Sequence, residues 1–216
     1  MNANNESAPK PVDSTPIVFV VDDDISVRES LELLIEQAQW RPQLFESAQA
    51  FLAHPRPLVP SCLVLDINLP DLNGLDLQNA IAGERPDMPI IFITGYGDVP
   101  RSVRAMKAGA VEFLTKPFDD EVLLIAIADA LQGSRVALSR EGDLRVLRDN
   151  HATLTPREQE VLDMVVAGRM NKVIASDLGI SEITVKAHRG RVMRKMKARS
   201  LADLVKKVGQ LLPQAD

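Results

Sequence analysis

Val18 to Asp24 reads VFVVDDD, four apolar residues followed directly by three aspartates. The apolar run is typical of a buried strand in a parallel sheet, and the acids stand where that strand ends. Two carboxylates about 4 Å apart repel by roughly 4 kcal/mol at an effective dielectric constant near 20. A bound cation, a lysine from elsewhere in the chain, or solvation at the strand end could offset this repulsion. In the simplest alternative, Asp24 caps a helix and the other two acids face water.

Length and composition indicate an ordinary soluble protein. The 216 residues allow two modest domains, and 45% of them are hydrophobic and 25% charged. Cys62 is the single cysteine, which excludes an internal disulfide framework, and we expect it to pack as a small hydrophobe. Residues 1–15 are polar, Pro-rich and without the apolar core of a signal peptide, so we expect a disordered tail. The continuous apolar runs fall short of a membrane span, which favours a cytoplasmic protein with no membrane partner.

Charge divides the chain. Residues 153–216 hold 12 Lys and Arg against 7 Asp and Glu, a net of +5, which leaves residues 1–152 with 13 against 23, a net of −10. Lys186 to Arg199 carries seven basic residues and no acidic one. A cluster of this kind suits a polyanion such as nucleic acid, although a solvated helix face has the same composition.

Residues 16–132 alternate apolar runs with amphipathic stretches, which predicts a parallel sheet with helices on both faces. We expect strands at 17–21, within 41–47, at 62–67 and 89–94, and ending at 111–117. We expect helices at 26–39, 48–53, 75–82, 100–108 and 119–132, with Asp98 as a cap of the fourth.

Residues 133–152 are polar and contain two glycines, so we expect a linker. Two alternatives remain open for this segment. It could continue the preceding helix, or its apolar positions Val136, Leu144 and Leu147 could form a weak coiled-coil seam.

From Thr155 onward the pattern is helical only. TPRE (155–158) predicts a helix start with a capping box and Pro at the first helical position, and this helix should end before Gly168. We expect further helices at 171–178, at 182–197 after a Ser181 cap, and from Ser200 to about 211. Two short helices joined by a three-residue turn that contains Gly indicate a helix-turn-helix, so residues 153–216 are predicted to form a DNA-binding domain.

Four of the five strands of the predicted sheet end in a residue suited to ligand chemistry, which in such sheets gathers at the carboxyl ends of the strands. The first strand ends at Asp22 and Asp23, the third at Asp66, the fourth at Thr94 and the fifth at Lys116. Three converging carboxylates form a hard, oxygen-rich site suited to Mg²⁺, with room for a phosphoryl group. Asp66 could attack phosphorus, Lys116 could neutralise the transferring oxygens, and Thr94 could hydrogen-bond the product.

The segments VVDDD, DINLPDLNG, FITGYG and EFLTKPF, in this order and spacing, resemble the receiver domain of two-component response regulators over residues 16–132. The segment LTPREQEVLDMVVAGRMNKVIASDLGISEITVKAHRGRVMRKM resembles a LuxR-type helix-turn-helix. Together they make the chain similar to the NarL/FixJ subfamily. This resemblance implies a doubly wound, five-stranded parallel sheet of the flavodoxin or CheY type, followed by a small all-α domain.

The resemblance also implies roles for the strand-end residues. Asp66 would be the phospho-acceptor. Asp23, Asp66 and the backbone carbonyl of Asn68 would bind Mg²⁺, with Asp22 acting through water. Lys116 would contact the phosphoryl group.

The resemblance further implies that Thr94 and Phe113 form a switch pair, although core packing is the simpler interpretation of Phe113 by itself. The bond from Lys116 to Pro117 would be a cis peptide. Gly95 stands where the family usually has Ala, which should change loop flexibility and not chemistry.

Helical spacing sorts the residues of the expected recognition helix into two faces. The stripe that should pack on the domain core consists of Val185, His188, Val192 and Met196. The opposite face, which should meet DNA, carries Ile183, Ala187, Gly190 and Arg194, flanked by Lys186, Arg191 and Lys197. The small Ala187 and Gly190 would let the backbone approach base edges closely. We predict Lys186 and Arg191 near bases, and Arg189, Arg194, Thr184 and Lys172 near phosphates.

The sequence therefore predicts a phosphorylation-activated transcription regulator, an activator by its subfamily resemblance and not an enzyme. Its partners would be a sensor histidine kinase, double-stranded promoter DNA, a second copy of the chain on phosphorylation, and RNA polymerase. A Mg²⁺-dependent phosphatase is one alternative, but Asn68 stands where that class carries a general acid. A regulator that binds a partner without phosphotransfer is another, and the complete set of strand-end residues argues against it.

Overall fold

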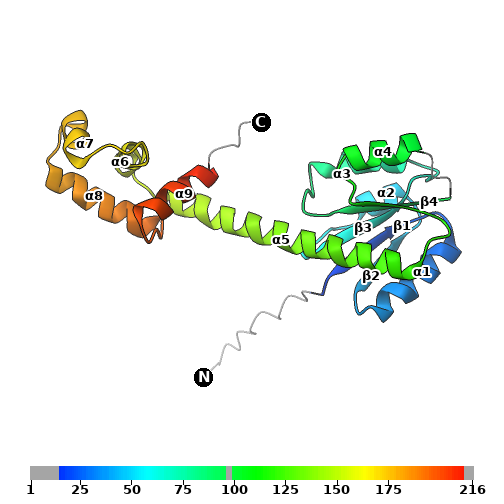
Figure 1. Ribbon diagram of the computed structural model, residues 1–216. Helices are drawn as coiled ribbons and strands as arrows, with labels where there is room; N and C mark the ends of the chain where they lie inside the picture. Colours follow the sequence, from blue (N-terminus) through cyan, green and yellow to red (C-terminus); the bar gives the residue numbers. More distant parts are fainter. Residues whose placement is uncertain (1–14, 96–98, 212–216) are drawn as a thin grey trace, which may run out of the picture. The chain divides into compact units, whose positions relative to one another are not determined.

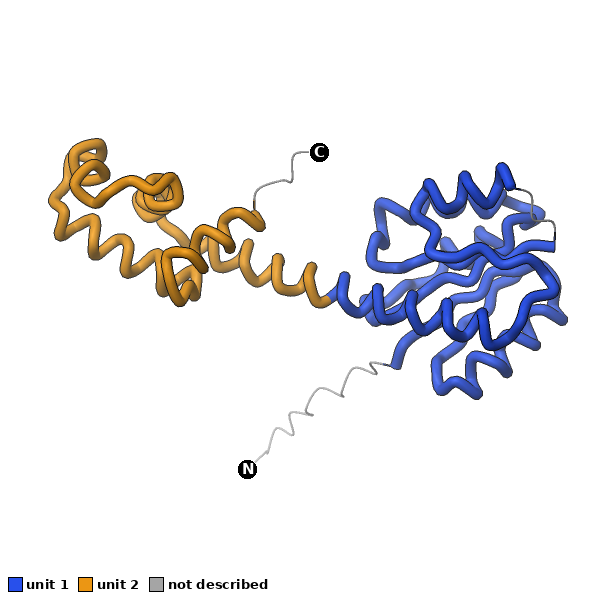
Figure 2. Tube along the Cα trace, in the orientation of Figure 1, with its two compact units in different colours: residues 1–138 blue, residues 139–216 orange. Residues whose placement is uncertain are grey.

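The computed structural model of the protein describes residues 15–95 and 99–211. The chain divides into two compact units, the first ending at Leu138 and the second beginning at Ser139 (Figure 2). The first unit contains a sheet with helices, and the second contains helices only. The predicted combination of an α/β fold and a small all-α fold is therefore confirmed.

Five strands form the sheet of the first unit in the order β2-β1-β3-β4-β5, and every neighbouring pair is parallel. The predicted five-stranded parallel sheet is thus confirmed. In the pairing of β1 with β3, Val21 lies opposite Leu65, so the residues that follow these two strands emerge at the same edge. The strands are β1 (Ile17–Val21), β2 (Arg41–Phe45), β3 (Ser61–Asp66), β4 (Ile90–Thr94) and β5 (Glu112–Thr115).

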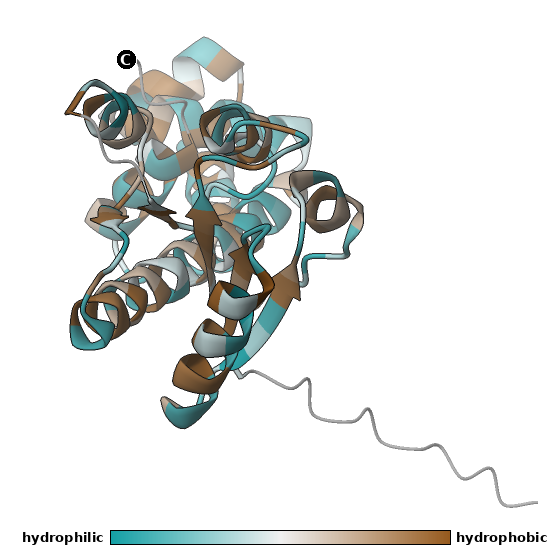
Figure 3. Cartoon of the chain, turned by 90° about the vertical axis from the view of Figure 1, so that its right-hand side faces the viewer, coloured by the Kyte–Doolittle hydropathy of each residue, from teal (hydrophilic) through white to brown (hydrophobic). Residues whose placement is uncertain are grey.

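Helices cover both faces of the sheet (Figure 1). On one face α1 and α5 pack through Leu31 and Ile127, and on the other α2, α3 and α4 pack through Phe51, Leu77 and Ala105. Strands β1, β3 and β4 are buried along their whole length, and the central strands of the sheet are brown, the colour of hydrophobic residues, in Figure 3. The helices are α1 (Ile25–Gln37), α2 (Ala48–Ala53), α3 (Gly74–Ala82), α4 (Val99–Lys107) and α5 (Asp120–Ala152).

The helix starts show how local side chains set the element bounds. Helix α1 begins at Ile25 because the carboxylate of Asp24 accepts a hydrogen bond from the backbone N–H of Ser26 at 2.8 Å, which caps the first turn. The third aspartate of the opening stretch is therefore a helix cap. Helix α4 begins at Val99, and its predicted cap, Asp98, lies outside the described residues.

Helix α5 continues through the segment that the sequence predicted as a linker. Residues 120–152 contain no proline, and the glycines at 133 and 142 each lower helix propensity by only about 1 kcal/mol relative to Ala. The hydroxyl of the fully buried Ser134 accepts a hydrogen bond from the backbone N–H of Ser61 at 3.0 Å, which fixes this helix at the start of β3. Residues 133–152 thus continue the preceding helix, which is the first of the two alternatives for this segment.

The apolar residues of the alternative coiled-coil seam differ in how far they are buried. Leu147 is buried in the core of the second unit, whereas the side chain of Val136 is 58% exposed. The structure therefore gives Leu147 a role in domain packing.

Helix α5 is also the one helix of the described residues that is long and apolar enough, by length and composition alone, to cross a membrane. A single helix of this kind is weak evidence of a membrane span, because the core helix of a soluble protein can be equally long and apolar. Leu123 and Ile127 of α5 pack in the core beneath the sheet.

The second unit consists of the end of α5 and four further helices around one hydrophobic core. Thr155 and Glu158 form the predicted capping box, and the side chain of Ser181 caps the helix that begins at Glu182. Gly168 and Gly179 have φ angles of 78° and 64°, which only glycine adopts freely, and each follows the end of a helix. The helices are α6 (Pro156–Val166), α7 (Asn171–Leu178), α8 (Glu182–Lys195) and α9 (Leu201–Leu211).

Candidate functional site

The carboxyl ends of β1 and β3 bring three acids together. Asp22 follows β1 and is fully buried, Asp66 ends β3 and is 6% exposed, and Asp23 is exposed. One carboxylate oxygen from each lies within 4.8 Å of the others. The parallel register of the two strands therefore produces the crowding that the sequence suggested.

Lys116, which follows β5, reaches across this edge of the sheet to the acids. Its Nζ donates hydrogen bonds to Oδ2 of Asp22 at 2.5 Å and to Oδ2 of Asp66 at 2.7 Å. The bond from Lys116 to Pro117 is a cis peptide, as the sequence resemblance implied. Part of the repulsion between the acids is thus offset by a lysine from a distant strand.

Burial and pairing set the charge states of this cluster. Burial raises the pKa of Asp22, and the hydrogen bonds from Lys116 and from the backbone N–H of Asp24 only partly oppose that shift. Burial acts to lower the pKa of Lys116, but its hydrogen bonds to Asp22 and Asp66 outweigh burial and raise it. Lys116 is therefore a cation throughout the physiological pH range.

The donor set fits a divalent cation. Three carboxylates and one ammonium give the cluster a formal net charge of −2, and the oxygens are hard ligands within 4.8 Å of one another. Mg²⁺ prefers carboxylate, carbonyl and water oxygens. The charge and chemistry of these side chains therefore match a Mg²⁺ ion.

Asn68 links Asp66 to two further residues. Its backbone N–H donates to Oδ1 of Asp66 at 2.9 Å, and its Nδ2 donates to Oγ1 of the buried Thr94 at 3.3 Å. Its Oδ1 accepts a hydrogen bond from Arg101 of α4 at 3.2 Å. The structure thus connects four of these residues, Asp66, Asn68, Thr94 and Arg101, in one network at the edge of the sheet.

Sequence reasoning missed two arginines at this edge. Arg101 contacts Asn68, and Arg28 of α1 donates from Nη1 to the backbone carbonyl of Asp22 at 2.6 Å. Both lie in the first turns of helices that follow strand ends, and that position was the signal that could have identified them.

Phe113 lies on β5 and is half-buried. Its ring packs beside Phe92 of β4, with ring centroids 6.4 Å apart, and contacts the core on the α3 and α4 side of the sheet. Thr94 is the last residue of β4 and pairs with Thr115 of β5. The predicted switch residues therefore occupy neighbouring strands near the acid cluster.

Helix α8 presents one buried and one exposed face. Val185, Val192 and Met196 are buried, and His188 is half-buried with an Nδ1 that has no hydrogen-bond partner among the described residues. Thr184 is half-buried, and its hydroxyl shares a hydrogen bond of 2.8 Å with that of Ser181. The exposed residues among those predicted to face DNA are Lys172 on α7 and, on α8, Ile183, Lys186, Ala187, Gly190, Arg191 and Arg194.

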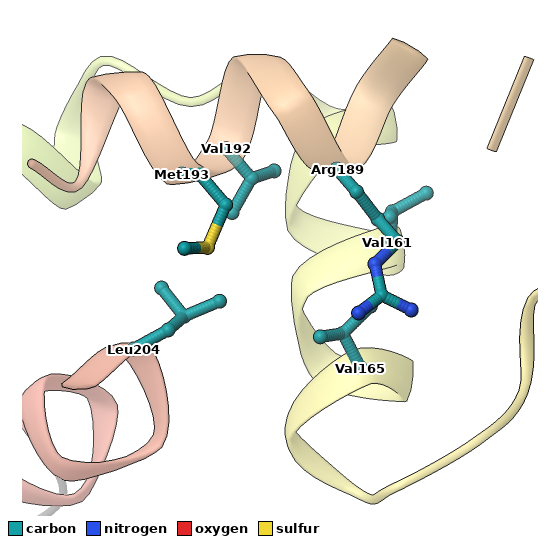
Figure 4. Close-up of a pocket in the computed structure, with 6 residues that line it drawn as sticks. All are labelled: Val161, Val165, Arg189, Val192, Met193 and Leu204. Atoms are coloured by element: carbon teal, nitrogen blue, oxygen red, sulfur yellow. The ribbon is translucent and has the colours of Figure 1, made fainter. Parts of the chain in front are cut away.

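Arg189 differs from the other predicted DNA contacts. Its guanidinium donates to Oδ1 of Asn171 at 2.7 Å, and its side chain lines a cavity of about 10 Å³ together with Val161 and Val165 of α6 (Figure 4). This hydrogen bond joins α7 to α8. The predicted contact of Arg189 with phosphate stays a prediction, and the structure gives the side chain a task within the domain.

A partly buried ion pair joins α6 to α8, with Glu158 buried and Lys195 half-buried. Lys195 donates from Nζ to Oε2 of Glu158 at 2.6 Å, and the backbone N–H of Thr155 donates to the same oxygen at 3.0 Å. The hydrogen bond from Lys195, followed by that from Thr155, lowers the pKa of Glu158 to about 2. Lys195 is therefore engaged in a contact within the domain, unlike the exposed basic residues of α8.

Two family models match the chain, in separate regions. "Response regulator receiver domain" matches residues 18–128, and "Bacterial regulatory proteins, luxR family" matches residues 152–208. Among curated proteins, nodulation protein W of Bradyrhizobium diazoefficiens is 50% identical over 190 residues, covering 88% of this chain and 84% of that protein. Response regulator protein TmoT of Ectopseudomonas mendocina is 43% identical, covering 90% of this chain and 88% of that protein.

Solved structures give the same relationship. The response regulator StyR is 47% identical, with a TM-score of 0.79, covering 91% of this chain and 99% of that one. Full-length FixJ from B. japonicum is 37% identical, with a TM-score of 0.53, covering 90% and 96%.

Proposed function

The chain belongs to the two-component response regulators that carry a LuxR-type DNA-binding domain, and we propose that Asp66 is the residue on which it accepts a phosphoryl group. Phosphorylation-activated regulation of transcription is the function of this family, and it involves a sensor kinase and DNA. The observation that carries the assignment of Asp66 is the contact of Lys116 with both Asp22 and Asp66 at the strand ends.

The chemistry of transfer follows from these contacts. An oxygen of Asp66 attacks phosphorus, the new O–P bond forms, and the P–N bond to the phosphohistidine of the kinase breaks, so the electron pair leaves with the imidazole. Lys116 neutralises the charge on the transferring oxygens, and the hydroxyl of Thr94 donates a hydrogen bond to one of them. Asp23, Asp66 and the carbonyl of Asn68 would hold a Mg²⁺ ion, with Asp22 acting through water, and the ion would supply further neutralising charge.

The chain is a regulator and not an enzyme with an external substrate. The side chain at position 68 is an amide, which lacks the acidic proton that a phosphatase of this chemistry needs at that place. We propose that the receiver assists only its own phosphorylation and dephosphorylation.

We propose that Thr94 and Phe113 pass the modification to the surface. Thr94 moves toward the phosphoryl oxygens, and Phe113 turns further into the core beside Phe92. The surface that changes lies on α4 and the turn before β5, where Val99, Val103, Met106 and Val111 are between 44% and 75% exposed. An apolar patch of this kind on a receiver supports the proposal that phosphorylation produces a homodimer.

We propose that the receiver spans residues 16–132 and the DNA-binding domain residues 153–216, with α8 as the recognition helix in the major groove. Lys186, Ala187, Gly190 and Arg191 approach bases, and Thr184, Arg189, Arg194 and Lys172 approach phosphates. As an activator in the cytoplasm, the DNA-bound dimer contacts RNA polymerase.

The first experiment measures mass and DNA binding before and after acetyl phosphate with Mg²⁺. Wild type should gain mass and DNA affinity, and Asp66→Asn should gain neither, because an amide is not a nucleophile toward phosphorus. Asp24→Ser is the matched control: Asp24 is an acid of the same run, but it caps α1, and serine caps equally well. If Asp66→Asn responds like wild type, Asp66 is not the acceptor.

A further inference from the structure

Ile183 has the most exposed large hydrophobic side chain in the described part of the chain, with 79% of its surface accessible. It lies in the first turn of α8, two residues after the Ser181 cap. A single exposed apolar residue is common on protein surfaces and needs no function of its own. The residues beside Ile183 on α8 are what distinguish it from such a residue.

The residues that follow Ile183 on the same face are small. Ala187 lies one turn further along α8 and Gly190 almost two, and both are exposed. A methyl group placed on Gly190 would have no described atom within 4 Å outside its own helix. Packing within the domain therefore does not require a glycine here, although glycine is among the least favourable residues inside a helix. The small side chains leave space for an external surface to approach the helix.

Charge identifies that surface. Lys186, Arg191 and Arg194 are exposed beside this face, and residues 186–199 contain no acid. The occupant is therefore a polyanion, which is DNA in the proposed function. The face pairs this cationic border with an apolar side chain at the helix N-terminus, the end that reads bases in helix-turn-helix proteins.

We infer that Ile183 is a specificity-determining residue that recognises the C5-methyl group of thymine in the major groove. Thymine is the one unmodified base that presents a methyl group in the major groove, and aliphatic side chains pack against this methyl. The inference rests on the proposed function, in which α8 is the recognition helix. It assigns to the binding site a preference for a T·A pair under the first turn of α8.

The test uses the full-length protein, phosphorylated with acetyl phosphate, and a duplex that it selects from a random-sequence pool. Each thymine of the selected half-site is replaced in turn by uracil, which removes only the methyl group. At the contacted position wild type should lose affinity about fourfold, the effect of removing one buried methyl from an apolar contact. Ile183→Ala should lose less than 1.5-fold at the same position.

Ile183→Ala should fold normally because the side chain is exposed, and its unfolding midpoint checks this. The inference is overturned if no thymine shows a penalty in wild type, if the half-site contains no thymine, or if Ile183→Ala keeps the full penalty. Lys186→Ala and Arg194→Ala separate this failure from failure of the proposed function. If both bind as wild type does, α8 is not the recognition helix. If both lose affinity while Ile183→Ala keeps the uracil penalty, only the role of Ile183 is wrong.

Discussion

Lys116 holds two carboxylates that would otherwise repel each other. Its Nζ lies 2.5 Å from Asp22 and 2.7 Å from Asp66, and the first of these acids is fully buried. Removing one partner of a buried ionic cluster leaves uncompensated charge, which is more destabilising than the net worth of the contact. The strand-end acids are therefore tolerated because a cation is always close to them, whether lysine alone or lysine with a metal ion.

Lys116→Met should lower the free energy of unfolding by about 1–3 kcal/mol without Mg²⁺, because the acids then repel unopposed. The same change takes the formal charge of the cluster from −2 to −3, so Mg²⁺ should bind about tenfold more tightly and restore part of the stability. Urea unfolding and calorimetric Mg²⁺ titration measure both effects. Lys107→Met, on the exposed end of α4, is the control and should change neither. Unchanged Mg²⁺ affinity in Lys116→Met would show that the lysine does not compete with the metal ion.

Glu158 is an acid whose charge stabilises the second unit. Its folded pKa of about 2 lies below its ordinary value of 4.5, because Lys195 and Thr155 donate hydrogen bonds to the charged form. Its contribution is therefore fully present above about pH 4.5 and is lost as the pH falls through about 2. Glu158→Gln should be less stable than wild type by about 1–2 kcal/mol at pH 7, and this difference should shrink between pH 4.5 and pH 2. Urea unfolding at several pH values measures it, and a difference independent of pH would argue against an ionic role.

The acids, Lys116 and Thr94 could be predicted from sequence because each directly follows an apolar run, and parallel strands bring such positions to one edge. The hydrogen bonds that Arg28 and Arg101 make, and the partly buried pairing of Arg189 with Asn171, could not be predicted. Their contacts depend on the direction of long side chains between helices, and neither apolar periodicity nor capping patterns encode that direction.

At the scale of elements, the strands were predicted well because β1, β3 and β4 are buried on both sides and read as continuous apolar runs. Helix α5 was harder, because polar residues and two glycines resemble a linker when tertiary contacts are unknown. The hydrogen bond of Ser134 to Ser61 and the burial of Leu147 support the helix at two places that no local pattern reveals.

Two glycines, one inside a helix and one with a positive φ, should respond in opposite ways to replacement by alanine. A methyl group at Gly142 or Gly168 would meet no described atom within 4 Å, but Gly168 has a φ of 78° and Gly142 lies inside α5. Gly142→Ala should therefore stabilise the protein by about 0.5–1 kcal/mol, and Gly168→Ala should destabilise it by about 1 kcal/mol. Urea unfolding measures both, and hydrogen exchange along α5 should slow in Gly142→Ala. If Gly142→Ala destabilises the protein, the glycine has a function in bending or signalling that the helix propensity does not describe.

At the scale of the whole molecule, the charge of residues 153–216 differs in sign from that of the rest of the chain, +5 against −10. This asymmetry was visible in the sequence, and it predicted which end binds a polyanion. The sequence does not reveal how many chains bind the DNA together, because that number depends on how phosphorylation changes a surface. Salt dependence of binding reports that number, since each phosphate contact adds about 0.9 to the slope of log K against log salt concentration.

The effect of Lys172→Ala on the salt dependence of binding reports how many protomers bind the DNA. Lys172 is exposed on α7, and we predict one phosphate contact for it in each protomer. If the phosphorylated protein binds as a dimer, the substitution should lower the slope by about 1.8, and by about 0.9 if one chain binds. Lys206→Ala, an exposed lysine of α9 with no predicted DNA contact, should leave the slope unchanged. A change of about 0.9 with phosphorylated protein would contradict the dimer, and no change would remove Lys172 from the DNA contacts. A change of about 1.8 would show that two recognition helices engage the duplex together, as two half-sites about one helical turn apart require.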